Sequence, residues 1–105
     1  MEVIVRAIGP HRAQLDWGKG ARRAAIGAGG IGDKRSEGDG ITPLGNFPVR
    51  NVLYRADRIA PPNTRLAASA IARDDGWCDA PLDPAYNRPV KLPYRTSAEA
   101  LWHDE

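Results

Sequence analysis

Short runs of alternating apolar and polar residues make up much of this chain, and glycine or proline separates each run from the next. Residues 2–8 (EVIVRAI) are rich in valine and isoleucine and end at Gly9-Pro10. Residues 12–18 and 21–27 lie on either side of Gly18-Lys19-Gly20, whose glycines can take the positive φ of a tight hairpin connection. This pattern predicts a strand followed by a hairpin, which together form a small meander.

From residue 46 onward the apolar residues alternate in two registers, with a break near Asn51. The alternation predicts either one strand with a bulge or two short strands. Residues 64–73 fit a short helix by propensity, or a strand with Leu66 and alanines on one side and Ile71 on the other; we favour the strand. Six prolines between residues 61 and 93 predict loops with strand fragments in that region.

The last ten residues, TSAEALWHDE, carry a helix-start signal. Thr96 stands three residues before Glu99, which is the spacing of a capping box, and Leu101 and Trp102 follow as apolar anchors. We therefore expect a short helix to begin here. Because a helix of so few turns is marginal on its own, we also expect these residues to be part of a longer domain.

The composition supports a β-rich fold. Eleven glycines and nine prolines make up about a fifth of the 105 residues, which favours turns and short strands over long helices. A hydrophobic fraction of 42% argues against disorder throughout, and no apolar run approaches the roughly 20 residues of a transmembrane helix. We predict a single, mainly β domain over residues 1–105 with no membrane span.

Charge and cysteine content exclude several classes of function. The net charge is only +2, although twelve of the fifteen basic residues are arginine, so we predict no nucleic-acid partner. The first nine residues have an acidic second residue and too short an apolar stretch for the charged and apolar regions of a secretory signal peptide. The single cysteine, Cys78, excludes an internal disulfide and cannot by itself form a thiolate metal site. We predict no metal and no cofactor.

Residues 37–50 (EGDGITPLGNFPVR) contain three glycines and two prolines, which predict a series of turns. Proline fixes φ near −65°, and a glycine two positions later permits a positive φ, so the TPLG turn is pre-organised. Glycines would let a ligand's backbone approach closely, and a pre-organised loop loses less entropy on binding. A hairpin turn that contacts no ligand is the alternative. The predicted substrate-binding residues are Gly38, Asp39, Gly40, Thr42, Pro43, Gly45 and Phe47.

Residues 38–47, GDGITPLGNF, resemble the G-D-G-x-T-P-x-G-x-F signature of the L,D-transpeptidase (YkuD-type) catalytic domain. The T-P-x-G-x-F element alone is moderately specific, whereas its combination with downstream segments is strong. The resemblance extends from about residue 27 to residue 102. The downstream segments that are similar to the family are VLYRADR (52–58), GWCD (76–79), YNRPVKLPY (86–94) and SAEALW (97–102).

The resemblance implies a β-sandwich that binds peptidoglycan stem peptides. In that family a cysteine thiolate attacks the carbonyl ahead of a terminal D-alanine, releases the D-alanine, and passes the acyl group to an amine of a second stem. This chemistry needs a thiol of lowered pKa, a histidine that takes its proton, and backbone donors for the oxyanion. In the family these groups lie in a later His and Gly-Cys segment, which these 105 residues lack. We therefore expect an incomplete sandwich, no catalytic residue, and no activity of the chain alone.

Cys78 is a poor substitute for that nucleophile. Three aspartates lie within four residues of it, and nearby carboxylates disfavour a thiolate. We favour a structural role for Cys78, with catalysis and intermolecular redox pairing as alternatives. His11 and His103 stand outside any motif that recruits a base, and we interpret both as solvated surface residues.

Two classes of function stay open. The first is an L,D-transpeptidase-family protein that acts on peptidoglycan stem peptides at the cell wall. The second is a small non-enzymatic β module that binds peptide, glycan or nucleic acid through aromatic residues and a stripe formed by Arg50, Arg55 and Arg58. The glycine run GAGGIG (27–32) lacks the spacing of a phosphate-binding loop, so it adds no third class.

Overall fold

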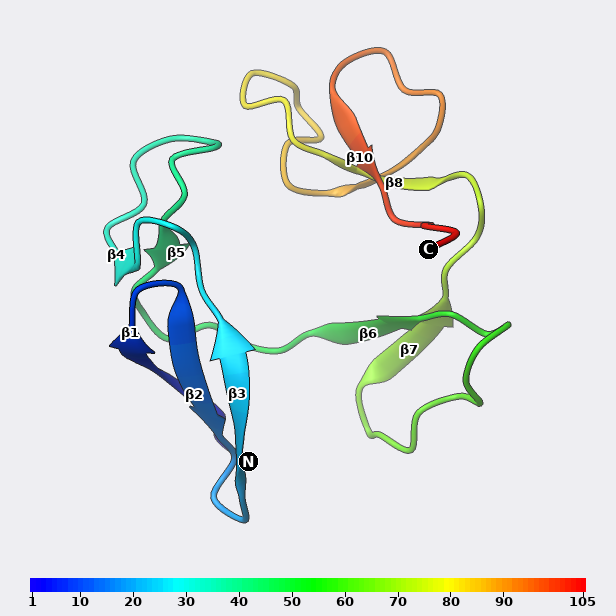
Figure 1. Cartoon of the computed structure of the whole chain (residues 1–105). Coiled ribbons are helices and arrows are strands. Elements are labelled where there is room, and N and C mark those ends of the chain that lie inside the picture. The colour runs from blue at the N-terminus through cyan, green and yellow to red at the C-terminus, as the bar shows by residue number, and fades with distance from the viewer. The chain divides into compact units, whose positions relative to one another are not determined.

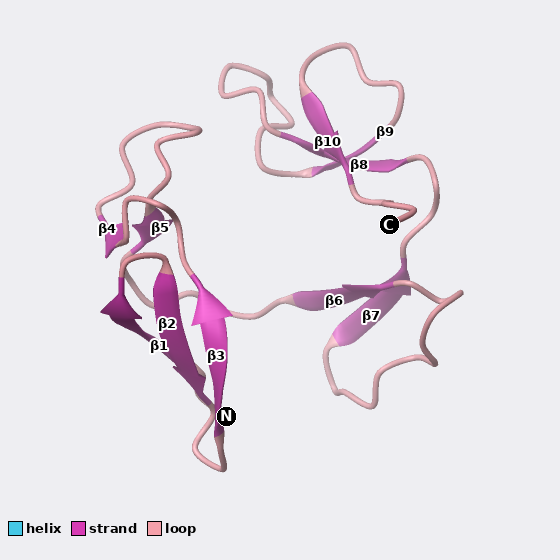
Figure 2. Ribbon diagram, in the orientation of Figure 1, coloured by secondary structure: helices cyan, strands magenta, loops and turns pink.

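The computed structural model describes all 105 residues, and its regular elements are β-strands, with no helix (Figures 1 and 2). The prediction of a mainly β chain is confirmed. The chain divides into two compact units, Met1–Phe47 and Pro48–Glu105, and each is described by itself. The strands are β1 (Ile4–Gly9), β2 (Arg12–Asp16), β3 (Ala21–Ala25), β4 (Ile31–Gly32), β5 (Thr42–Pro43), β6 (Asn51–Tyr54), β7 (Ala67–Ala70), β8 (Asp75–Cys78), β9 (Pro89–Lys91) and β10 (Ala98–Ala100).

In the first unit the predicted meander forms an antiparallel sheet with the strand order β1-β2-β3 (Figure 2). Its second turn is closed at Gly18, which has a φ of 87° and donates its N–H to the Asp16 carboxylate at 2.7 Å. Glycine takes this φ without a steric penalty, which is why the glycine pair marked the turn in the sequence. A register shift between Ala7 and Gly9 kinks β1 near its end.

The rest of the first unit is a long loop held by a very short parallel pair. Ile31 of β4 lies opposite Thr42 of β5, and Gly32 lies opposite Pro43. The pair brings the glycine run of residues 27–32 next to the TPLG turn. These two segments, distant by about ten residues in the sequence, therefore form the two sides of one loop.

The second unit contains two small sheets. Strands β6 and β7 form a parallel pair, and β10, β8 and β9 form an antiparallel sheet in that order (Figure 2). The strand interpretation of residues 64–73 is confirmed over Ala67–Ala70. The expectation for residues 46–54 is wrong in part: one strand begins at Asn51, and residues 46–50 lie outside any strand. Pro48 lacks the N–H that a paired strand would need there.

The helix predicted from Thr96 is not present. Ala98–Ala100 instead form strand β10, with Ala98 opposite Cys78 and Ala100 opposite Gly76. The Thr96 hydroxyl donates to the Asp83 carboxylate at 3.1 Å rather than capping a helix. Pairing with β8 thus overrides a local capping signal that is too short to nucleate a helix by itself.

The apolar core is very small. The only fully covered apolar side chains are those of Ala13 and Cys78. The chain exposes 8386 Å², whereas a compact monomer of 11.4 kDa exposes about 5,800 Å², and two separate compact globules of half that mass expose about 7,000 Å² together. Many large apolar side chains therefore meet water. The most exposed of them are Met1, Ile8, Leu44, Phe47, Val49, Ile59 and Leu82.

Candidate functional site

The seven predicted substrate-binding residues lie together in the first unit, in the segment that we call the TPLG loop (residues 37–47). Thr42 and Pro43 form β5, and the remaining residues lie in the loop segments before and after it. Gly38 and Gly40 have φ values of 76° and 71°, a region that favours glycine. The structure thus agrees with the local reading of this segment as a loop of tight glycine turns.

Asp39 shapes the TPLG loop from within. Its carboxylate accepts the N–H groups of Arg35 at 2.8 Å, Ser36 at 3.2 Å and Ile41 at 3.0 Å, and the ammonium of Lys34 at 2.8 Å. The hydrogen bond from Lys34, followed by those from the backbone, holds the pKa of Asp39 far below its ordinary value. Both oxygens are occupied, so Asp39 orders the loop and has little capacity left for a ligand.

Thr42 has a similar inward role. Its hydroxyl accepts the N–H of Gly27 at 2.8 Å, and its own N–H donates to the carbonyl of Gly30 at 2.9 Å. Next to it, the N–H of Gly29 donates to the carbonyl of Gly40 at 2.8 Å. These bonds join the glycine run to the middle of the TPLG loop, between Gly40 and Leu44.

Gly27 is a structural residue of this site that was not predicted. A Cβ at position 27 would lie 2.1 Å from the carbonyl oxygen of Gly40, so no other residue fits there without moving the loop. The glycine run itself is the signal in the sequence that points to this position. Because its amides at 27, 29 and 30 donate to oxygens within the chain, the run is not an open anion cradle.

Three side chains face outward and remain free to meet a ligand. Pro43 is exposed, Leu44 is 70% exposed and Phe47 is 66% exposed. The Phe47 ring lies over Gly45, where an added Cβ would come within 3.1 Å of it. The TPLG loop therefore presents an apolar surface on a backbone that is already fixed.

Cys78 lies in the second unit and is fully buried on β8. Its N–H donates to the carbonyl of Arg88 at 3.0 Å, and its carbonyl accepts the N–H of Asn87 at 2.8 Å. Neither histidine forms a hydrogen bond with it: His11 occupies the β1–β2 turn with a φ of 62°, and His103 follows β10. Full burial favours the structural role and leaves no path for a substrate or a partner thiol.

A buried carboxylate, Asp83, connects two loops of the second unit, and nothing in the local sequence marked it. Its side chain is only 2% exposed and accepts the Tyr94 hydroxyl at 2.7 Å and the Arg95 guanidinium at 3.0 Å. It also accepts the N–H of Ala85 at 2.8 Å and the hydroxyl of Thr96 at 3.1 Å. The N–H of Ala85 and then the Tyr94 hydroxyl lower the pKa of Asp83, so the buried group stays ionised.

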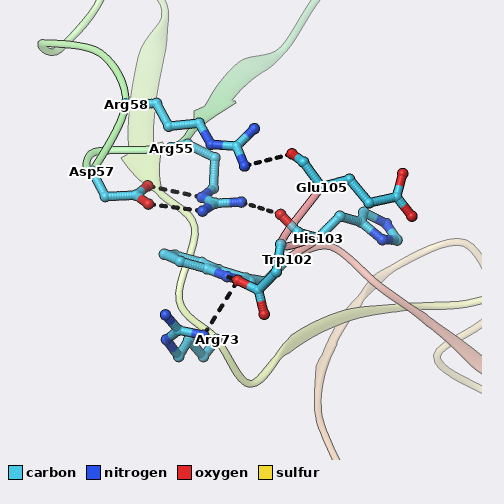
Figure 3. Close-up of polar contacts among 8 residues, drawn as sticks. Arg55, Asp57, Arg58, Arg73, Trp102, His103 and Glu105 are labelled. Carbon is cyan, nitrogen blue, oxygen red and sulfur yellow. Dashed lines mark hydrogen bonds and ion pairs between the residues drawn. The ribbon is translucent and has the colours of Figure 1, made fainter.

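Two of the three arginines proposed as a basic stripe, Arg55 and Arg58, bond within the chain, in a cluster that we call the tryptophan latch (Arg55, Asp57, Arg58, Arg73, Trp102 and Asp104). The third, Arg50, is exposed and lies outside this cluster. Figure 3 shows the Arg55 guanidinium on one side of the Trp102 indole, 3.5 Å from the ring centroid, and that of Arg73 on the other, at 4.6 Å. With both faces covered, Trp102 offers no stacking surface for a base or a sugar.

The remaining contacts of the tryptophan latch tie the last residues to the segment after β6. Arg55 forms a bidentate ion pair with Asp57, in which Nε and Nη2 donate to the two carboxylate oxygens at 2.8 and 2.7 Å. It also donates to the carbonyl of His103. Arg58 donates to the main-chain oxygen of Glu105 at 2.6 Å (Figure 3). These arginines hold main chain in place and do not form an open patch.

Comparisons with protein-family models, curated proteins and solved structures give no match for this chain. The resemblance to the L,D-transpeptidase family therefore rests on the motifs of the sequence alone. Nor does the structure contain a helix with the length and apolar character needed to cross a membrane.

Proposed function

We propose that this chain forms the substrate-binding part of an L,D-transpeptidase-like domain, in which the TPLG loop contacts a peptidoglycan stem peptide. In this proposal the small sheets of both units belong to the β-sandwich of that family. The cysteine and histidine of the acyl transfer come from polypeptide other than these 105 residues, because Cys78 is enclosed and has no histidine beside it.

The observation that carries the proposal is the internal construction of the TPLG loop. The Asp39 carboxylate accepts the N–H groups of residues 35, 36 and 41, and Thr42 and Gly40 bond to the backbone of the glycine run, so the loop needs no ligand to order it. The apolar side chains of Leu44 and Phe47 nevertheless remain in water. A loop with a fixed backbone and an exposed apolar rim suits an extended peptide, since little conformational entropy is lost when it binds.

In the proposed reaction the loop positions the stem peptide for attack by the thiolate. The thiolate adds to the carbonyl carbon ahead of the terminal D-alanine, the C–N bond breaks, and D-alanine leaves with a proton. An amine of a second stem then displaces the sulfur from the acyl group. The loop supplies orientation, which lowers the entropic part of the barrier, while proton transfer belongs to the thiol and its base.

Calorimetric titration of a stem tetrapeptide that ends in D-alanine tests the proposal. Leu44→Ala removes an exposed apolar side chain from the loop and should weaken binding at least threefold. Leu82→Ala is the matched control, because Leu82 is 99% exposed and lies in the other unit, and it should leave the affinity unchanged. Equal losses in the two variants, or no heat of binding in the parent chain at millimolar peptide, would refute the proposed role of the loop.

A further inference from the structure

Strand β7 has β6 on one side and no strand on the other. Isolated two-stranded sheets are marginal, and parallel sheets normally lie inside larger ones. All four residues of β7 are exposed. The open edge of this strand is therefore a candidate interaction surface that is separate from the TPLG loop.

The hydrogen bonds of the edge can be followed residue by residue. The Ile71 N–H donates to the Tyr54 carbonyl at 2.8 Å, so odd-numbered residues of this segment point their backbone groups toward β6 and even-numbered ones point them away. Among the outward N–H groups, that of Leu66 donates to the Thr64 hydroxyl and that of Ala72 to the Asp75 carboxylate. The N–H groups of Ala68 and Ala70 have no acceptor within the chain.

This edge also lacks the features that usually prevent strand addition. Residues 66–72 (LAASAIA) contain no charge and no proline, and β7 pairs without a register shift. Charged residues, proline or a bulge normally protect an exposed edge. The other sheets with strands of three or more residues follow that rule: β1 has a bulge and Arg6, β3 has Arg22 and Arg23, β9 has Pro89 and Lys91, and β10 has Glu99.

The side chains of β7 indicate what kind of strand the edge would accept. They are alanine and serine, which are too small to cover the larger side chains of β6 on either face of the sheet. Leu53, opposite Ser69, therefore remains 40% exposed. A second copy of β7 would add only more alanine and serine, and such pairs contribute little. A strand with β-branched or aromatic residues at alternate positions would cover Leu53 on one face and Val52 and Tyr54 on the other.

We propose that the outer edge of β7 is a strand-acceptor site, at which Ala68 and Ala70 pair with an extended segment of another polypeptide that carries bulky apolar side chains. The added strand supplies acceptors for the two outward N–H groups and donors for the two outward carbonyls. In such strand addition the main-chain hydrogen bonds provide the affinity, and the size of the partner's side chains provides the specificity. The proposal does not depend on the role of the TPLG loop.

Amide hydrogen exchange read by NMR tests the site with a defined probe, the capped peptide Lys-Thr-Val-Thr-Val-Thr-Val-Lys. At about 1 mM probe, the amides of Ala68 and Ala70 should exchange at least tenfold more slowly, while the Gly29 amide of the other unit should not change. A peptide with proline at its two central positions should give no protection. Absence of protection by the first peptide would overturn the proposal.

Two variants at one position separate pairing from folding. Ala68→Pro removes an outward N–H, which an edge strand tolerates, and should abolish protection by the probe. Ala68→Val keeps the N–H and should retain it. The Ile71 amide, which pairs with β6, must stay protected in both variants to show that the sheet is intact. If Ala68 and Ala70 are instead protected without peptide and lose protection on dilution, the occupant is a second copy and the proposed heterologous strand is wrong.

Discussion

Each of the two units is stabilised internally by a different kind of hydrogen bond. In the first, backbone hydrogen bonds and the Thr42 hydroxyl join the glycine run to the TPLG loop, while the Asp39 carboxylate, which accepts from Lys34 and from backbone N–H groups, orders the loop itself. In the second, Asp83 and the tryptophan latch join segments through side chains, and Arg55 reaches a carbonyl 48 residues away. A loop stabilised by backbone hydrogen bonds depends on glycine and can be recognised in the sequence. A network of side-chain hydrogen bonds depends on pairs of residues that are far apart in the sequence, and no local pattern identifies them.

The largest effect is expected from removal of Asp83. In Asp83→Ala the Tyr94 and Thr96 hydroxyls and the Arg95 guanidinium lose a shared buried acceptor, so the loops that they connect should separate. The amide of Asp79, which donates to the Ser97 carbonyl, should lose at least tenfold in exchange protection.

The first unit provides the internal control for this variant. Protection of the Gly29 amide should not change, because the two units have separate hydrogen-bond networks. Asp83→Asn keeps one acceptor oxygen and should lose less protection than the alanine variant. If Asp79 stays protected in Asp83→Ala, side-chain bonds are not what holds the second unit.

The converse test is Gly27→Ala in the first unit. The added Cβ would meet the Gly40 carbonyl oxygen at 2.1 Å, and overpacking against rigid backbone should destabilise the loop by about 3 kcal/mol. Urea denaturation, followed through the Gly29 amide, measures the loss. Gly9→Ala is the matched control, since nothing lies within 4 Å of a Cβ there. Similar losses for both variants would show that the close packing at Gly27 is not important.

Much of the fold could be predicted because glycine, proline and alternation act locally. The meander, the strand within residues 64–73 and the glycine turns of the TPLG loop all follow from backbone preferences of neighbouring residues. The helix expected from Thr96 was wrong because the deciding contacts, with Asp83 and β8, come from residues far away in the sequence.

The candidate site shows the same division. Its residues could be selected from the motif, but the inward roles of Asp39 and Thr42 and the steric role of Gly27 depend on how residues 27–32 and 37–44 lie against each other. Asp83 carried no signal in the sequence, because its side-chain partners lie 11 to 13 residues away and a single aspartate in a proline-rich loop is normally solvated.

A smaller effect is expected from acid. The pKa of Asp39 and that of Asp83 are both lowered by folding, so the stability they contribute is present above the ordinary aspartate pKa of 3.8 and is lost as the pH falls below it, toward their lowered values. The amides of Arg35 and Ile41 should therefore keep their chemical shifts down to about pH 4 and move only below it. Asp39→Asn should remove this pH dependence in the loop. A transition centred at or above pH 4 would contradict the assigned contacts.

No effect at all is expected at Cys78. The chain incubated with a stem tetrapeptide or a carbapenem should keep its mass, because the thiol is enclosed and has no base. Intact-mass spectrometry measures this, and denatured chain treated with iodoacetamide shows that the thiol itself is reactive. An acyl adduct on Cys78 under native conditions would establish it as a nucleophile and overturn the structural role.

The role of the TPLG loop is tested most directly by a residue-resolved NMR titration of the chain with the D-alanine-terminated stem tetrapeptide. We expect saturable shifts of the amides of Gly38, Gly40 and Leu44, with the pattern of hydrogen bonds to Asp39 and Thr42 unchanged, since the loop is formed before the peptide arrives. Shifts confined to other parts of the chain, or a TPLG loop that becomes protected from exchange only after peptide is added, would contradict it.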